Sequence, residues 1–431
     1  MGNKTVKNAA WIIGCRVIQA VFGLLVTMLS ARYLGPSGYG LINYAASLVA
    51  FFVPVMQLGL NSTLVREIID DPEHEGQTLG TALVLTLISS IACILGIWLV
   101  TSVMNRGETV TITVCVLYSL LLVFQSLEMI QYWFQAKLLS KYTSLTILAA
   151  YVVISVYRIA LLVNGSSIYW FSISQALDFG IISVTLLCLY RKLSTQRLSF
   201  SVNRAATMLK RSRHYIISAM MVTIFAQTDR IMLKLMIDEA AVGFYSAAAS
   251  CAGLTTFVFV AIIDSARPAI LEAKQKSCEQ FQYRMKLLFM VIISLALLQS
   301  LVISILAKFV VAVLYGSEYG ATVDVLRIIV WYTTFSYLGA VRDIWILAEE
   351  KQRCLWRINL SGVAANVVMN AVLIPQYGIN GAAFASLITQ IFTNIIMGWI
   401  IKTIRPCNRL MRASMSPRFI FTQARTFLLR R

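Results

Sequence analysis

A series of long apolar segments recurs along the whole of this chain and limits what it can fold into. A bilayer core of about 30 Å is crossed by about 20 apolar residues of α-helix. Hydrophobic residues make up 58% of the 431 residues and charged residues only 13%, whereas a soluble domain carries about 25% charged residues. We therefore expect an all-α integral membrane protein with twelve transmembrane helices. These spans are expected at residues 9–34, 39–60, 78–104, 110–134, 144–163, 169–189, 215–237, 243–263, 287–314, 322–348, 358–374 and 381–401.

The distribution of Lys and Arg predicts the orientation of these spans. If the N-terminus is cytoplasmic, 28 of the 37 Lys and Arg residues fall in cytoplasmic segments, and the expected outer loops contain only Arg106. Such an asymmetry is what the positive-inside rule describes. We therefore expect a multi-pass protein with both termini in the cytoplasm. The same distribution accounts for the net charge of +18 without a nucleic-acid partner.

The longest cytoplasmic loop follows the sixth span, which predicts two six-helix bundles around a central cavity. The expected parts are an N-terminal bundle (residues 1–190), a basic cytoplasmic linker (191–214), a C-terminal bundle (215–401) and a basic cytoplasmic tail (402–431). A weak repeat supports this division, because residues 40–47 (GLINYAAS) align with residues 243–250 (GFYSAAAS). Chance similarity between Ala- and Gly-rich helices is the alternative explanation.

Short motifs at the expected turns occur in a characteristic order. They are ARYLGPSGYG (31–40), QLGL (57–60), TDRIML (228–233), VGFYS (242–246), LYGSEY (314–319) and IPQYGINGAA (374–383). Together they resemble the motifs of polysaccharide repeat-unit (O-antigen) flippases, a family of the multidrug/oligosaccharidyl-lipid/polysaccharide exporter superfamily. The resemblance is imperfect at Gln57, where the family usually has an acidic residue.

This resemblance implies a flippase that moves an oligosaccharide on undecaprenyl pyrophosphate from the inner to the outer leaflet of a bacterial cytoplasmic (inner) membrane. It also implies alternating access driven by an ion gradient. The implied partners are membrane lipids and, through the family, a polysaccharide polymerase and a chain-length regulator. Two alternatives stay open: a multidrug or cation exporter of the same superfamily, and a membrane polymerase or glycosyltransferase. The second would require a substantial outer domain, which the short outer loops do not provide, so we do not expect an enzyme.

Cations inside the spans are the residues expected to bind an anionic cargo. A charge at the middle of a membrane helix costs about 2.5–3.5 kcal/mol, so one that is kept there usually has a role. The planar guanidinium of Arg forms paired hydrogen bonds with phosphate oxygens. Pairing with a nearby acid or contact with lipid headgroups is the alternative for each cation. The candidate cargo-binding residues, all polar positions within spans, are Arg16, Gln19, Arg158, Gln227, Arg230 and Lys234.

Acidic residues inside spans are candidates for ion coupling. Asp178 lies near the middle of the sixth span, Asp229 lies in the seventh, and Glu128 lies near an inner interface. A structural pair with a nearby Arg is the alternative. On the tenth span, Arg327 follows Asp324 by three residues, which predicts a pair on one helix face.

The cysteine and histidine content argues against several chemistries. None of the eight cysteines lies in an expected outer loop and no two form a CxxC motif, so neither disulfides nor a zinc site is expected. Histidine occurs only as His74 and His214, both in expected cytoplasmic loops. We expect no metal, no cofactor and no catalytic residue.

Overall fold

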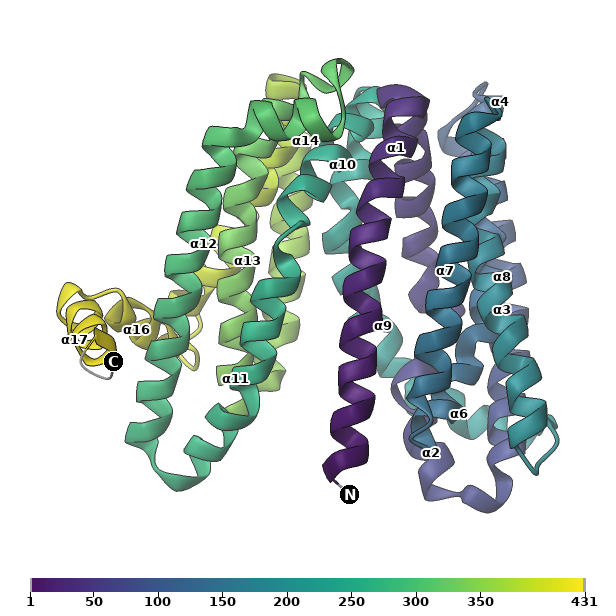
Figure 1. The fold of residues 1–431 in the computed structure, drawn as a ribbon, viewed down its shortest axis with the longest axis horizontal. Coiled ribbons are helices and arrows are strands. Elements are labelled where there is room, and N and C mark those ends of the chain that lie inside the picture. The colour runs from purple at the N-terminus through teal and green to yellow at the C-terminus, as the bar shows by residue number, and fades with distance from the viewer. Residues whose placement is uncertain (1, 429–431) are drawn as a thin grey trace. The chain divides into compact units, whose positions relative to one another are not determined.

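The computed structural model of this chain describes residues 2–428, with side chains at residues 23, 25–419 and 421–423. The described backbone is helical almost throughout and contains no strand (Figure 1). The helices are α1 (Gly2–Met56), α2 (Leu64–Asp70), α3 (Glu75–Met104), α4 (Thr109–Ser119), α5 (Leu121–Leu127), α6 (Gln131–Ala136), α7 (Ser140–Val163), α8 (Ile168–Leu193), α9 (Val202–Met236), α10 (Glu239–Gly253), α11 (Thr256–Lys276), α12 (Cys278–Leu314), α13 (Thr322–Ala348), α14 (Leu355–Ile391), α15 (Met397–Ile400), α16 (Arg405–Ser414) and α17 (Pro417–Leu428).

The described residues confirm a multi-pass helical membrane protein, while the count of twelve spans stays a prediction. Eight helices are long and apolar enough to cross a bilayer, or nine if α10 and α11, which meet at a bend of 46°, form one span. Two of the predicted turns lie within α1 and α14, each of which bends at a single residue. The backbone of α1 is broken at Gly35 (φ 66°) and that of α14 at Gly378 (φ 58°), and glycine adopts positive φ without steric cost. Both breaks fall at the turns predicted from the sequence.

The chain divides by its internal contacts into unit 1 (Met1–Gly243) and unit 2 (Phe244–Arg431). Unit 1 contains α1 to α9 and the first turn of α10, and α9 packs along α1 and α3. The predicted division at residues 191–214 stays a prediction, because contacts within one conformation do not define the parts that move.

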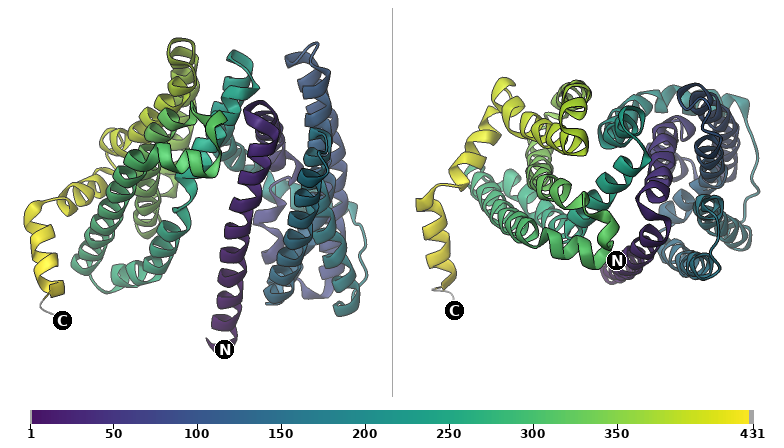
Figure 2. Two further views of the ribbon diagram at one scale, coloured as in Figure 1. Left: turned by 45° about the horizontal axis from the view of Figure 1, so that its top comes forward. Right: turned by 90° about the horizontal axis from the view of Figure 1, so that it is seen from above.

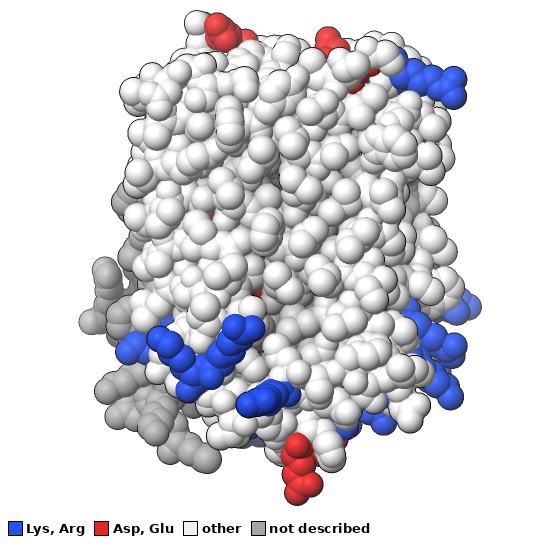
Figure 3. Space-filling model, turned by 90° about the vertical axis from the view of Figure 1, so that its right-hand side faces the viewer, with Lys and Arg blue, Asp and Glu red and all other residues white. Residues whose placement is uncertain are grey.

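On one face of the molecule, most charged side chains lie toward the two ends of the helices (Figure 3). On the face shown in Figure 3, Lys and Arg gather at the lower end, and the wide band above them shows almost no charge. We call this lower end the basic end. It carries the N-terminus of α3 and the C-terminus of α8, which ends with Arg191 and Lys192 in its last turn. An apolar band between charged ends is what a lipid bilayer requires of a protein surface.

Aromatic packing holds the helices of unit 1 together near the basic end. The Trp133 ring makes edge-on contacts with Phe134 and Tyr190, at centroid distances of 5.1 and 5.0 Å. These rings belong to a buried cluster that includes Leu64 of α2 and Met208 of α9. Edge-to-face aromatic pairs add about 0.5–1.5 kcal/mol to the burial of their area. The short helices α2 and α6 are therefore fixed parts of unit 1.

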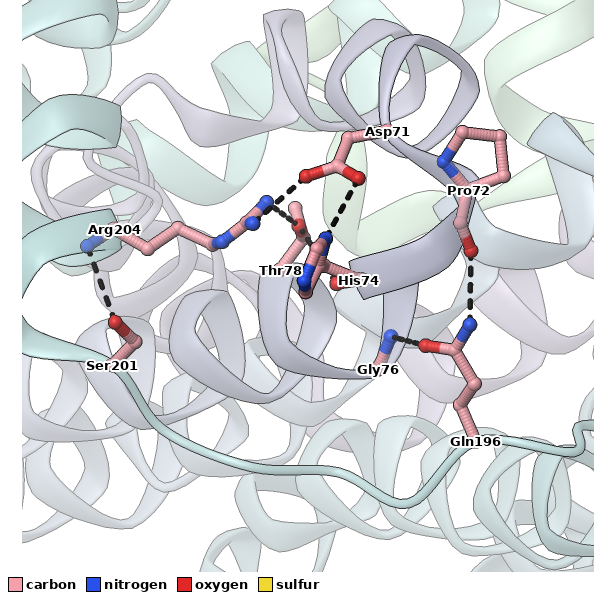
Figure 4. A network of polar contacts seen from close by, with 8 residues as sticks. All are labelled: Asp71, Pro72, His74, Gly76, Thr78, Gln196, Ser201 and Arg204. Carbon is pink, nitrogen blue, oxygen red and sulfur yellow. Dashed lines mark hydrogen bonds and ion pairs between the residues drawn. The ribbon is translucent and has the colours of Figure 1, made fainter.

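The non-helical residues 194–201 between α8 and α9 lie against the start of α3, and we call them the strap (Figure 4). The side-chain carbonyl of Gln196 accepts a hydrogen bond from the Gly76 amide at 2.9 Å, and its Nε2 donates to the Pro72 carbonyl at 2.9 Å. The Ser201 amide donates to Thr81 Oγ1 at 3.1 Å. The strap is therefore bound to unit 1 along its length.

Unit 2 is built around α12, α13 and α14 (Figure 2). A short π-helix follows α14 at Phe392–Ile396. A π-turn leaves carbonyls without their usual helical partners. Here Arg342 donates to the Thr393 carbonyl at 2.9 Å and Asn408 donates to the Ile395 carbonyl at 2.8 Å. Asn408 belongs to α16, which packs on α12. The basic segment after α15 is therefore attached to unit 2 by a specific polar contact.

Replacing Gly80 by Ala should detach the strap from α3. A Cβ at Gly80 would lie 2.4 Å from the Ser199 carbonyl oxygen, so the strap would have to move, although Ala for Gly in a helix normally stabilises by about 0.5–1 kcal/mol. We expect faster trypsin cleavage after Arg197 in membranes. Gly253→Ala is the matched control, because its Cβ would meet nothing within 4 Å. Equal cleavage of the Gly80 variant and the wild type would show that this packing is wrong.

Candidate functional site

Arg158 of α7 is held by the neighbouring helix α8. Its Nε donates to Ser174 Oγ and its Nη2 donates to Gln175 Oε1, both at 3.0 Å. The side chain is half-buried. These contacts occupy two of the five guanidinium N–H groups. The guanidinium is therefore oriented by α8 and retains donors for a further acceptor.

One predicted ion-coupling residue, Asp178, interacts with Arg158, and a second, Glu128, interacts with Asp178. Asp178 follows Ser174 by one turn of α8, and electrostatic interactions link it to both Arg158 and Glu128. The Oδ1 atom of Asp178 is buried and accepts no hydrogen bond from the described residues. The structure thus brings together three residues that the sequence assigned to two different roles. We call Arg158, Ser174, Asp178 and Glu128 the Arg158 cluster.

Gln227 and Arg230 of α9 form a second polar group, together with α1. The Gln227 side-chain carbonyl accepts hydrogen bonds from Ser47 Oγ at 3.0 Å and from Arg230 Nη1 at 2.8 Å. Ser47 is buried and Arg230 is half-buried. Gln227 therefore orients Arg230 and connects it to α1. Asp229, the adjacent predicted ion-coupling residue, is buried.

Lys234, predicted to bind cargo, lies between two carboxylates. Its Nζ is 2.8 Å from Glu108 Oε2 and 2.7 Å from Glu239 Oε1, and its side chain is only 5% exposed. The hydrogen bond from Lys234 holds the pKa of Glu108 below its usual value, so this carboxylate is ionised at neutral pH. The Lys234 charge is balanced in this conformation, and its role in cargo binding stays a prediction.

Two predicted cargo residues, Arg16 and Gln19, lie on α1 outside the described side chains. The expected pair on α13 is present, with Arg327 Nη1 at 3.1 Å from Asp324 Oδ1 and both side chains at least half-exposed. Arg342 differs from it, because its side chain is 7% exposed and donates to a π-helix carbonyl as well as to Asp343. Its contacts are those of a structural residue.

An ion-pair network lies near the strap at the basic end (Figure 4). Arg204 donates to Asp71 Oδ2 at 2.8 Å and to Thr78 Oγ1 at 2.6 Å, and His74 lies 3.0 Å from the other Asp71 oxygen. The hydrogen bonds with His74 and with Arg204 lower the pKa of Asp71. A cavity of about 500 Å³ adjoins this network. Its lining includes the acids Glu67, Asp70 and Asp71 and the bases Arg204 and Arg211.

Sequence reasoning missed several residues of these groups. Glu108 and Glu239 belong to no motif, Ser47 only ends a repeat segment, and their partners are distant in the chain or lie across a turn. One signal was present: Glu108 and Glu239 fall in or beside predicted outer turns, and Lys234 lies near the outer end of its span. Opposite charges at the same predicted depth could have suggested an ion pair.

Comparison with known proteins identifies the family. A family model described as "Polysaccharide biosynthesis protein" matches residues 5–274, more than half of the chain. The chain belongs to this family. It is 21% identical over 401 residues to the capsular polysaccharide biosynthesis protein CapF of Staphylococcus aureus, covering 89% of this chain and 96% of CapF.

Two kinds of solved transporter share the fold. The lipid II flippase MurJ in an inward closed conformation aligns with a TM-score of 0.75 at 14% identity, covering 94% of this chain and 90% of MurJ. An inward-facing multidrug resistance MATE family transporter of the MOP superfamily aligns with a TM-score of 0.66 at 13% identity, covering 92% and 96%. This family member therefore has a transporter fold.

Replacing the buried Arg342 by Ala should lower the thermal stability of the detergent-solubilised protein. The Thr393 carbonyl would lose its donor, and an unsatisfied buried acceptor costs about 1–3 kcal/mol. Arg327→Ala is the matched control, because that exposed pair should contribute no more than about 1 kcal/mol. Melting curves should show a fall of several degrees for the first variant only; equal curves would remove the structural role of Arg342.

Proposed function

We propose that this protein flips an undecaprenyl-pyrophosphate-linked oligosaccharide, an O-antigen or related surface-polysaccharide unit, from the inner to the outer leaflet of the bacterial cytoplasmic membrane. One observation carries the proposal: the chain belongs to a polysaccharide-biosynthesis family and has the fold of a transporter. The named relative acts in capsular polysaccharide biosynthesis and the structural relative flips lipid II. Transport by alternating access without enzymatic catalysis fits both.

The chemistry of this cargo fits the two polar groups of unit 1. The cargo joins an apolar tail, an anionic diphosphate and a hydrated glycan, so a carrier must provide cations while the tail stays in lipid. Arg158 and Arg230 are each oriented by an amide side chain, and a guanidinium matches phosphate oxygens in charge and geometry. We assign the diphosphate to these two residues and to Arg16, and glycan hydrogen bonds to Gln19 and Gln227. Lys234 joins this set only when it leaves Glu108 and Glu239.

The Arg158 cluster offers a way to couple an ion to the cargo. Asp178 interacts with both Arg158 and Glu128, and a proton or cation bound by its carboxylate weakens its hold on Arg158. Binding of the coupling ion at Asp178 or Glu128 would then release Arg158 to the diphosphate. Asp229, next to Arg230, is the second candidate for this role.

The proposed setting follows from the distribution of basic residues along the sequence. With the Lys- and Arg-rich segments of the sequence in the cytoplasm, both termini are cytoplasmic, and the basic tail lies close to anionic lipids of the inner leaflet. In α16 the side chains of Cys407 and Leu410 are buried, as is Ile404 just before the helix, while Arg409 and Arg412 are exposed, as expected at a headgroup surface. Besides lipids, the proposed partners are the polymerase and the chain-length regulator of the same pathway.

Deletion of the gene tests the proposed cargo. The lipid-linked oligosaccharide should accumulate on the cytoplasmic face, and surface polysaccharide should fall. A second candidate, export of drugs or lipophilic cations, is suggested by the MATE fold. If the protein exports drugs, deletion of the gene should instead make the cells drug-sensitive and leave surface polysaccharide normal. Lipid extraction with mass spectrometry, together with drug-susceptibility tests, separates the two.

In the complemented deletion strain, Arg158→Ala and Arg230→Ala should each reduce surface polysaccharide roughly tenfold or more. Each loses a charged hydrogen bond to phosphate, worth about 1.5–3 kcal/mol. Arg327→Ala, which removes an exposed pair, is the control and should export normally. Membrane levels are measured by immunoblot. Full export by both variants at normal levels would contradict the assignment of the diphosphate to these arginines.

Asp178→Asn should make transport insensitive to the ion gradient, because an amide neither gains nor loses a proton and binds cations weakly. The measurement is flipping of the lipid-linked oligosaccharide in proteoliposomes, with and without an imposed proton or sodium gradient. Asp324→Asn on α13 is the control, since Asp324 is exposed. An unchanged gradient response in the Asp178 variant would exclude this residue from coupling.

A further inference from the structure

Two glycines meet at the end of unit 1 opposite the basic end. A Cβ on Gly40 would lie 1.8 Å from the Glu239 carbonyl oxygen and 2.7 Å from the Gly243 amide nitrogen. A Cβ on Gly243 would lie 2.0 Å from the Pro36 carbonyl oxygen. The first turn of α10 therefore touches the backbone of α1 just after its break at Gly35. These two glycines are the first residues of the two segments that the sequence repeat aligns.

An ion bridge lies at the same end of unit 1. Lys234 joins Glu239, at the start of α10, to Glu108, in the turn between α3 and α4. Glu108 also accepts hydrogen bonds from Thr111 at 2.8 Å and from Asn105 at 3.4 Å. Asn105 in turn accepts one from Tyr44 of α1 at 3.0 Å. One chain of polar contacts thus connects α1, the α3–α4 turn, α9 and α10.

From these contacts we infer that the Gly40–Gly243 contact and the Lys234 bridge together form a latch that closes the outer end of the transport path and must open in each cycle. The inference rests on the proposed function, because only a carrier that alternates its access needs such a closure. It gives Lys234 a role that the cargo assignment does not: its charge holds the closed state.

The two parts of the latch are suited to a contact that forms and breaks. Backbone contact between glycines gives a close fit without interlocking side chains, so separation requires no rotamer change. The ion bridge is different, because Lys234 is almost fully buried while Glu108 and Glu239 are 43% and 29% exposed. Opening would bring all three charges into water, where each is well solvated. The bridge therefore favours closure without making it permanent.

Cys115 of α4 is a native reporter of the latch. Its side chain is 0% exposed, and it interacts electrostatically with Lys234 and Glu108 and with Tyr44. In the closed state a membrane-impermeant maleimide added from the outer side should hardly react with it. If the latch opens, water and reagent reach this thiol.

The experiment measures maleimide modification of Cys115 in full-length protein in right-side-out membranes, located by peptide mass spectrometry. Lys234→Met should raise the rate about tenfold or more, since it removes the charge and keeps a side chain of similar length. Gly40→Ala should raise the rate as well, because its Cβ cannot fit against Glu239. Arg327→Met and Gly253→Ala are the matched controls and should react at the wild-type rate.

A graded series distinguishes the latch from general loss of structure. Glu108→Gln and Glu239→Gln each leave Lys234 one carboxylate, so each should raise the rate less than the double variant, which should match Lys234→Met. Cys93 of α3, buried and donating to the Phe52 carbonyl, should stay unreactive throughout. Labelling of Cys93 in a variant would show that this variant is misfolded. The latch is then judged from the rate of Cys115 modification in the remaining variants.

The latch is overturned if Cys115 reacts at the wild-type rate in Lys234→Met, in Gly40→Ala and in the double Glu variant. This outcome does not depend on transport, because the assay measures modification of a thiol and not export of the glycan. The converse result is that Cys115 labelling rises in the graded order while deletion of the gene leaves surface polysaccharide normal. That pair of results would support the latch and reject the proposed cargo.

Discussion

The cost of holding a charge away from water organises the interior of this protein. Lys234 is buried between Glu108 and Glu239, Arg342 is buried against a π-helix carbonyl, and Arg158 is oriented by Ser174 and Gln175. In an apolar surrounding a cation without such partners would cost several kcal/mol. Each cation therefore fixes the elements that supply its partners. These contacts bring helices distant in the sequence into defined positions.

The membrane character, the family and many helix limits could be predicted from the sequence, because they depend on local properties. Apolar length determines where a helix can cross a bilayer, and the expected span at residues 322–348 coincides with α13. Glycine in a turn motif determines where a helix can break, as at Gly35 and Gly378. The start of α9 could not be predicted in this way. Its first turns are polar, and they are helical because Ala205 and Met208 are buried against unit 1.

The polar groups were only partly predictable. Arg158, Asp178, Gln227 and Arg230 could be found because charged or amide side chains are rare inside spans. Their partners could not, since periodicity describes one face of one helix and carries no information about the neighbouring helix. Glu108 and Lys234 are 126 positions apart in the chain. The link from Arg158 through Asp178 to Glu128 likewise emerges only from packing, and it places residues proposed for ion coupling and for cargo binding in one group.

Because the strap is bound to α3, the connection between α8 and α9 does not behave as a flexible linker. A free loop of this length would act as a flexible tether and leave the following helix to sample many directions. Here Gln196 and Ser201 fix the segment to α3, and Arg204 continues that attachment into α9 itself. The position and direction of the start of α9 are therefore fixed. Any reorientation of α9 and of the helices after it must begin beyond the first turn of α9, where Arg204 is held by Asp71 and Thr78.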